Sequence, residues 1–225
     1  MTCFRKAMVH ISAIFYLSGS VFSLQVLAGD YAENPAAQRF FEEMKERHNF
    51  DELELRKLFS QVYRDQSIID LISKPAEKRL AWRDYREIFL DNARVKNGIK
   101  FWRENENVIS EVSDRSGVPG EIITAIIGAE TRYGKVMGNH RVVSALSTLA
   151  FDYPPRSRFF RRELEAFLLL TREEGKSPLE LKGSYAGAMG YGQFMPSSYR
   201  AYAVDSDRDG ERDIWNSRAD AIGSV

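Results

Sequence analysis

The sequence is poor in cysteine and has no excess of charge of either sign. Its one cysteine, Cys3, precedes a long apolar run, so the chain beyond residue 28 has no thiol for a disulfide, a nucleophile or a thiolate metal site. Lys and Arg number 32, against 32 Asp and Glu, which gives no global field for nucleic acid. Hydrophobic residues make up 44% of the chain, enough for a packed core.

The first 28 residues have the pattern of an export signal. Arg5 and Lys6 precede an apolar run from Ile11 to Ala28, and Val26 and Ala28 supply small residues at the −3 and −1 positions of a cleavage site. We expect a signal peptide over residues 1–28 and a soluble exported protein. An uncleaved anchor is the alternative, because the run is near the lower length for spanning a membrane. Cys3 is badly placed for a lipoprotein anchor.

Most of the remaining chain has the apolar spacing of helices. Amphipathic stripes recur from Pro35 to Ser113, and again over residues 141–151 and 157–171. The region before residue 114 contains no internal repeat and no low-complexity linker. The spacing therefore predicts a mainly α protein.

One helix, predicted between Pro119 and Gly134, is apolar in nearly every direction. This pattern is typical of a helix buried on most sides. Proline suits the first turn of a helix and glycine the position just past its end. We therefore expect a core helix.

The helix carries one acidic side chain in its last turn. Glu130 follows Ile126 by four residues and Ile123 by seven, so it projects on their face. Burial and the helix dipole both raise a carboxyl pKa there, toward the range of a general acid at neutral pH. The alternative is a structural glutamate paired with Arg132 or Arg141.

Residues 183–195, GSYAGAMGYGQFM, alternate glycines with aromatic side chains. Glycine allows close approach of a ligand, and exposed rings with amides such as Gln193 suit a groove for a sugar chain. The spacing matches neither nucleotide-binding glycine motifs nor a serine-hydrolase elbow at Ser184. The alternative is a glycine-rich packing turn.

An acidic run follows, with Asp205, Asp207 and Asp209 at alternating positions and Gly210 sixth. This arrangement matches the first half of a calcium loop, in which the seventh residue offers a backbone carbonyl. Position twelve is Asn216, so the usual bidentate glutamate is missing, and Asp213 or Asp220 would have to substitute. The alternative is an acidic, water-exposed turn.

Four motifs together resemble one family. AIIGAETRYG, TLAFDYP, GSYAGAMGYGQFMPSSY and AVDSDRDG followed by DAIGSV are closely similar to lytic murein transglycosylase B, a family of exported enzymes that cut peptidoglycan on a lysozyme-like fold. The resemblance runs from about Phe40 to Val225. It implies that Glu130 is the single catalytic acid and base, and that the substrate-binding residues are Tyr85, Ser184, Tyr191 and Gln193. It also implies a structural calcium and no catalytic cofactor, with metal ligands Asp205, Asp207, Asp209, Glu211 and Asp220.

The resemblance also implies a fold and a division of the chain. We expect a signal peptide (1–28), an additional N-terminal helical region (29–114) and a lysozyme-like catalytic core (115–225) with a short EF-hand-like loop (205–220). Three features depart from the family: one extra residue before Asp220, no lipoprotein cysteine, and an end at Val225 where family members continue. We therefore expect a C-terminally truncated chain.

The implied reaction needs one carboxyl group. The family cleaves the β-1,4 bond between MurNAc and GlcNAc and forms 1,6-anhydroMurNAc, with the C6 hydroxyl of the same sugar as nucleophile. A lysozyme-type hydrolase would need a second carboxylate, with Asp152 or Asp84 as candidates, and a catalytically impaired peptidoglycan-binding fragment is the other alternative. The implied location is the periplasm. The implied partners are glycan strands, with cell-wall synthesis proteins or hydrolases left open, and no nucleic acid.

Overall fold

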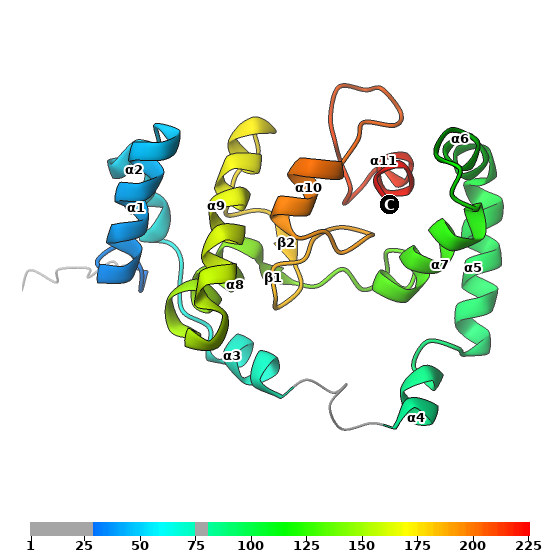
Figure 1. Cartoon of the computed structure of the whole chain (residues 1–225), viewed down its shortest axis with the longest axis horizontal. Coiled ribbons are helices and arrows are strands. Elements are labelled where there is room, and N and C mark those ends of the chain that lie inside the picture. The colour runs from blue at the N-terminus through cyan, green and yellow to red at the C-terminus, as the bar shows by residue number, and fades with distance from the viewer. Residues whose placement is uncertain (1–28, 75–80) are drawn as a thin grey trace, which may run out of the picture.

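A computed structural model gives the structure of the chain and describes residues 29–74 and 81–225 (Figure 1). The predicted signal peptide lies outside the described residues. Among residues 29–74 and 81–225, no helix combines the length and the apolar character needed to cross a bilayer.

The described residues are mainly helical, as the apolar spacing predicted (Figure 1). The two short strands pair antiparallel, with His140 opposite Gly183. In chain order the elements are α1 (Pro35–His48), α2 (Glu52–Phe59), α3 (Gln66–Ser73), α4 (Trp82–Glu87), α5 (Asn92–Glu104), α6 (Glu106–Ser116), α7 (Gly120–Thr131), β1 (His140–Arg141), α8 (Val142–Asp152), the 3-10 turn η2 (Pro154–Arg156), α9 (Ser157–Glu173), β2 (Lys182–Gly183), α10 (Pro196–Tyr202) and α11 (Arg218–Ser224).

Side chains at the helix starts explain where several helices begin. Asn34, Asp51 and Asp91 each accept a hydrogen bond from a backbone N–H in the first turn of α1, α2 and α5. Such a side chain satisfies a donor that the helix itself leaves without a partner. The starts of these helices are therefore set by local sequence.

The larger apolar cluster joins α1, α2 and α3 to α8, α9 and α10. Phe40, Phe59, Leu146 and Phe167 are among its fully buried members. A polar contact also crosses this interface, because the Tyr31 hydroxyl donates to Asp152 over 2.6 Å. The first helices of the chain are thus packed on the pair α8–α9, which lies at the centre of that cluster (Figure 1).

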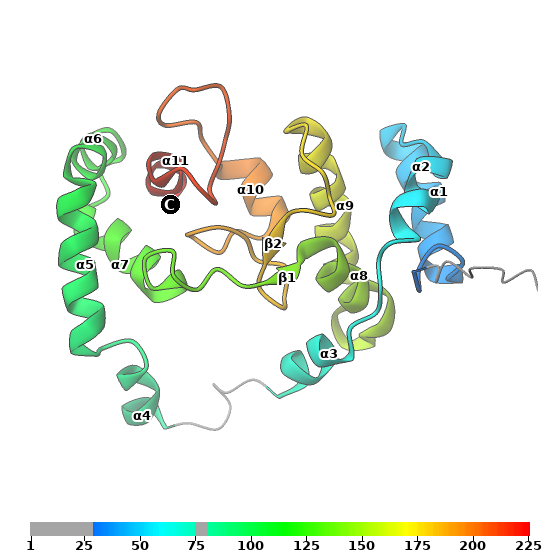
Figure 2. The same ribbon diagram turned by 180° about the vertical axis from the view of Figure 1, so that it is seen from behind.

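A smaller cluster joins α5, α6, α7 and α11 at the other end of the molecule (Figure 2). Its buried members are Phe101, Ile109, Val112, Ile123, Ile127 and Ile222. Each of the two clusters combines residues from before and after residue 114. The packing therefore does not separate the chain at 114, and the division into 29–114 and 115–225 stays a prediction.

Candidate functional site

Helix α7 is open to solvent along one side, contrary to the expectation of burial on most sides. Ile123 and Ile127 are 1% and 0% exposed, whereas Ile122 and Ile126 are 51% and 39% exposed. Apolar periodicity could not show this, because it does not reveal which neighbours cover a helix. Glu130 lies one turn after Ile126, at the edge between the buried and the open side.

The Glu130 carboxyl has a raised pKa. It is exposed as a whole residue, yet enough protein surrounds the carboxyl for burial to raise its pKa above the usual value of 4.5. Among the described residues it has neither a hydrogen bond nor an ion pair. The alternative of a structural pair with Arg132 or Arg141 therefore finds no support.

The chain leaves α7 through an unusual turn. The helix ends at Thr131 rather than just before Gly134, because Arg132 and Tyr133 both have left-handed backbones, with φ of 51° and 62°. Non-glycine residues in this region are uncommon and cost about 1–3 kcal/mol each, and they gather at functional sites. The strained turn begins two residues after Glu130.

Contacts with the glycine-rich segment hold this turn in place. The Thr131 hydroxyl lies 2.8 Å from the carbonyl oxygen of Tyr191, and the backbone N–H of Gly134 donates to the same hydroxyl over 3.0 Å. Gly134 lies so close to the Tyr191 ring that a Cβ would overlap it. Tyr191 is therefore beside the end of α7, as a shared site with Glu130 requires.

Gln193 and Ser184 hold the backbone of the glycine-rich segment. The Gln193 amide nitrogen donates to the carbonyls of Gly190, over 3.1 Å, and Met137, over 3.3 Å. The Ser184 hydroxyl accepts from the N–H groups of Ala186 and Ala188. The packing-turn interpretation of this segment thus has direct support, and any contact of these side chains with a sugar stays a prediction.

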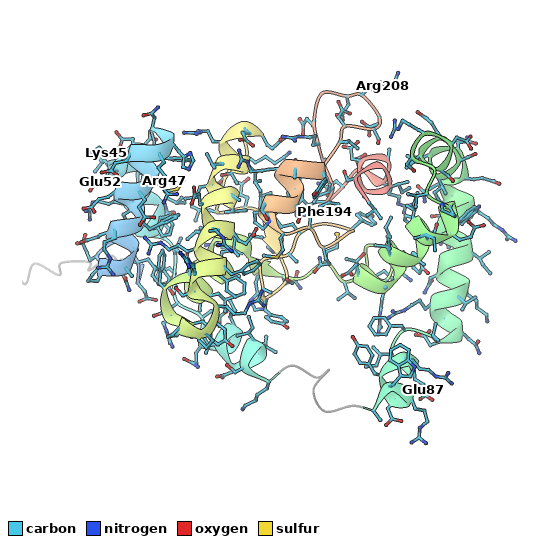
Figure 3. The ribbon with its side chains drawn as sticks, viewed as in Figure 1. Lys45, Arg47, Glu52, Glu87, Phe194 and Arg208 are labelled. Atoms are coloured by element: carbon cyan, nitrogen blue, oxygen red, sulfur yellow. The ribbon has the colours of Figure 1, made fainter. Side chains whose placement is uncertain are left out.

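The segment folds back on itself at the centre of the molecule. Met189 is fully buried and pairs by its backbone with both Gly183 and Phe194, and Phe194 is visible in the middle of the molecule (Figure 3). This core anchors the segment on the larger cluster, while Tyr191 reaches the smaller one. The segment therefore connects the two apolar clusters, and it contacts the chain at Thr131 and Gly134, just after Glu130.

Tyr85 lies on α4, apart from the other predicted site residues. Its ring packs on Trp82 and Phe89, with centroid distances of 6.1 and 5.3 Å. Contacts between the described residues do not bring it to Glu130 or Gln193, so its role at a cleft stays a prediction.

The two candidate second carboxylates are engaged elsewhere. The Asp152 carboxylate accepts a hydrogen bond from the Tyr31 hydroxyl and lies 3.7 Å from the Arg64 guanidinium. Asp84 pairs with the neighbouring Arg83 over 3.2 Å. The described contacts place neither of them beside Glu130.

The acidic loop brings three carboxylates together. One oxygen each from Asp205, Asp207 and Asp209 lies within 4.8 Å of the others, a cluster of the oxygen ligands that calcium prefers. Backbone N–H groups of the loop donate to Asp205 and hold its carboxylate in place. Arg208 points outward at the tip of the loop (Figure 3). These three residues fit a cation site.

The other predicted ligands have different surroundings. The Glu211 carboxylate is paired with Lys176 over 3.2 Å, so its contribution would come from its backbone carbonyl. Asp220 is fully buried, and its oxygens accept from the N–H groups of Ser206, Asp207 and Asp213. Asp220 thus organises the loop from inside, and direct ligation by it stays a prediction.

Two residues near the site were missed by sequence reasoning. The Tyr133 hydroxyl lies in a notch between Gly98 of α5 and Gly128 of α7, where any Cβ would collide with it. These helix-interior glycines were the available signal, since a glycine that weakens a helix usually has a packing reason. Arg94, buried beside them, gave no signal in the sequence.

Comparisons with known proteins agree on the family. The family model described as transglycosylase SLT domain matches residues 32–225. The chain is similar to membrane-bound lytic murein transglycosylase B of Escherichia coli strain K12, with 47% identity over 208 residues, which cover 88% of this chain and 57% of the relative. The chain thus spans little more than half the length of that relative.

Solved structures resemble the fold over most of the chain. The lytic transglycosylase Slt35 of Escherichia coli in complex with calcium has a TM-score of 0.82 and 47% identity, over 90% of this chain and 65% of that one. SltB3 from Pseudomonas aeruginosa in complex with NAG-NAM-pentapeptide has a TM-score of 0.75 and 34% identity, over 83% of this chain and 50% of that one. These matches confirm the predicted lysozyme-like, mainly α fold.

Proposed function

The chain belongs to the transglycosylase SLT domain family, and we propose that it is a lytic transglycosylase that cuts peptidoglycan between MurNAc and GlcNAc. The environment of the Glu130 carboxyl group is the observation on which the proposed activity rests. The pKa of this carboxyl group is raised by burial, the carboxyl group has no hydrogen bond or ion pair among the described residues, and Glu130 stands two residues before a turn that the glycine-rich segment holds in place.

One carboxyl group can serve both steps of this reaction. Glu130 donates its proton to the glycosidic oxygen, and the bond from that oxygen to C1 of MurNAc breaks. The resulting carboxylate takes the proton of the C6 hydroxyl, whose oxygen bonds to C1 and closes the 1,6-anhydro ring. Because this hydroxyl belongs to the substrate, its effective concentration is high and the protein needs no nucleophile.

Hydrolysis is the less favoured reaction. Retaining and inverting glycosidases place a second carboxyl group about 5 to 9.5 Å from the acid. Asp152 is occupied by Tyr31 and Arg64, and Asp84 by Arg83. Their engagement supports the one-carboxylate reaction.

The acidic loop suits a structural calcium ion. A relative's structure is described as a complex with calcium, and the three aspartates of this chain's loop suit that ion. We infer a structural calcium, since the loop supports Tyr191 through a hydrogen bond between the Tyr191 N–H and the Ile214 carbonyl.

The E. coli relative is named membrane-bound and acts on murein, and we infer that this chain works in the periplasm.

The test compares Glu130→Gln with wild type on purified sacculi, with mass spectrometry of the released products. We expect wild type to release anhydro-ended fragments and the variant to lose about 10²- to 10⁴-fold in rate, as for removal of a general acid. Glu121→Gln, in the first turn of α7, is the matched control and should keep its rate. Reducing ends would indicate hydrolysis, and absence of cleavage by wild type would indicate a binding protein.

A further inference from the structure

Arg94 of α5 is a buried cation with no ion pair among the described residues. The residue is 9% exposed, and its Nε and Nη1 atoms have no hydrogen-bond partner in the part of the chain that the structure describes. Its guanidinium lies 5.3 Å from the centre of the Phe89 ring. A buried charge left without a partner is costly, so its presence points to a partner that binds from outside.

Arg94 lines a small cavity between the start of α5 and the turn after α7. The cavity has a volume of about 180 Å³, and its polar lining comes from Arg94, Arg132 and Lys135 together with Asp91, Asn97 and Tyr133. A group as small as a carboxylate suits this volume. One of the residues that line the cavity, Arg132, follows Glu130 by two positions in the sequence.

The charge around the cavity is positive. Three cations face one carboxylate, Asp91, which leaves an excess of two positive charges. Asp91 is engaged in capping α5, where it accepts from the Arg94 backbone N–H over 2.7 Å. The Lys135 ammonium donates to Asn97 over 3.0 Å, and among the described residues the Arg132 side chain has no hydrogen bond.

We propose that this cavity binds a carboxylate of the peptide stem carried by the glycan strand that Glu130 cuts. The inference rests on the proposed function, because it places the stem of the same substrate. Guanidinium groups bind carboxylates with strong, often bidentate hydrogen bonds. The uncharged disaccharide of a stem-bearing strand offers no such group, whereas the stem peptide does.

The first experiment measures kcat/KM on two soluble glycan substrates at constant ionic strength. One carries stem peptides with free carboxyl groups, and the other carries the same stems with those groups converted to methyl amides. Wild type should cleave the free-acid substrate about tenfold faster. In Arg132→Gln and Arg94→Met the ratio should fall toward one. Lys100→Gln, a matched loss of charge on α5 outside the cavity, should keep it.

The second experiment measures binding without turnover. A soluble stem peptide is titrated calorimetrically into wild type and into both variants, with acetate and inorganic phosphate titrated in parallel. Arg94→Met should weaken peptide binding at least fivefold and leave the melting temperature unchanged or raised, because it removes an unpaired buried charge.

The outcomes separate this proposal from the proposed function. Equal substrate ratios in wild type and both variants overturn the stem site, as does acetate binding as tight as peptide binding. Wild type that binds the peptide through Arg94 and Arg132 but cleaves neither substrate supports the stem site and contradicts the transglycosylase activity.

Discussion

Glu130 combines solvent access with a perturbed carboxyl group. Its side chain stands at the edge of the open side of α7, beside the exposed Ile126, and burial raises its pKa. A general acid needs both properties, because it must hold a proton near neutral pH and still reach the substrate.

The raised pKa predicts two pH dependences. An acid works only when protonated, so kcat/KM should fall as pH rises through the Glu130 pKa, with a midpoint above 4.5. The folded state also holds the Glu130 proton more tightly than the unfolded state does. The free energy of unfolding that protonated Glu130 contributes in the wild type is therefore lost as pH rises from the usual carboxyl pKa through the raised one. Glu130→Gln should therefore melt progressively higher than wild type across that interval. Parallel melting curves at all pH values would contradict the raised pKa.

Gln193 links side-chain hydrogen bonds to a left-handed backbone. With φ of 49° and two carbonyl partners, Gln193→Ala should lose about 1–2 kcal/mol of stability as well as activity. Gln193→Gly is the matched variant, since it loses the same amide but adopts this φ without strain. Thermal melts of both variants measure this loss of stability. An Ala variant as stable as wild type would mean that the Gln193 amide does not stabilise the fold and serves substrate binding only.

At the scale of elements, the acidic loop is a unit with two layers. Asp205, Asp207 and Asp209 gather at its surface, while Asp220 fixes the backbone beneath them from the first turn of α11. Surface and buried carboxylates therefore have different expected effects on stability.

Calcium should raise the melting temperature of the protein. Binding to the native state alone adds RT ln(1 + [Ca²⁺]/Kd), about 2.7 kcal/mol at a hundredfold excess. With Asn216 at position twelve, we expect a Kd on the order of 10⁻⁴ to 10⁻³ M. Asp207→Asn should lose the shift, and Glu211→Gln should keep it because its carbonyl remains. Equal calcium shifts in wild type and Asp207→Asn would refute the site.

Asp220→Ala should destabilise the protein even with chelator present. It would leave three N–H groups without their acceptor, and each buried unsatisfied donor costs about 1–3 kcal/mol. We expect a loss of about 3 kcal/mol or more by chemical denaturation. A loss seen only in the presence of calcium would make Asp220 a ligand and not a support.

At the scale of the molecule, the two clusters differ in size and cover. The larger one surrounds α8 and α9, whereas the smaller one leaves Val95, Ile99, Ile122 and Ile126 of α5 and α7 exposed. Regions with fewer buried apolar contacts open at lower free energy. Hydrogen exchange should therefore be faster in α5, α7 and α11 than in α8 and α9, and uniform protection would contradict this.

The helices, the acidic loop and Glu130 followed from local pattern. The apolar spacing of a helix repeats over many residues, and three aspartates at alternating positions of a short loop are close to one another whatever the rest of the fold. Both features can therefore be predicted from the sequence alone. Asp205, Asp207 and Asp209 are accordingly grouped in the structure. The role of Gln193 as a backbone donor was not readable, because its acceptor at Met137 is 56 residues away.

By itself the sequence determined the helical class, the family and the single carboxyl group at the end of α7, because these depend on residue types at short spacing. Only the tertiary structure decided which side of α7 is open, which carboxylates are already engaged, and that Arg94 is buried with no hydrogen-bond partner for its Nε and Nη1 atoms among the described residues. Burial and pairing depend on which distant segments meet, as when Tyr31 reaches Asp152 across 121 positions. Local periodicity in the sequence does not indicate which distant segments come into contact.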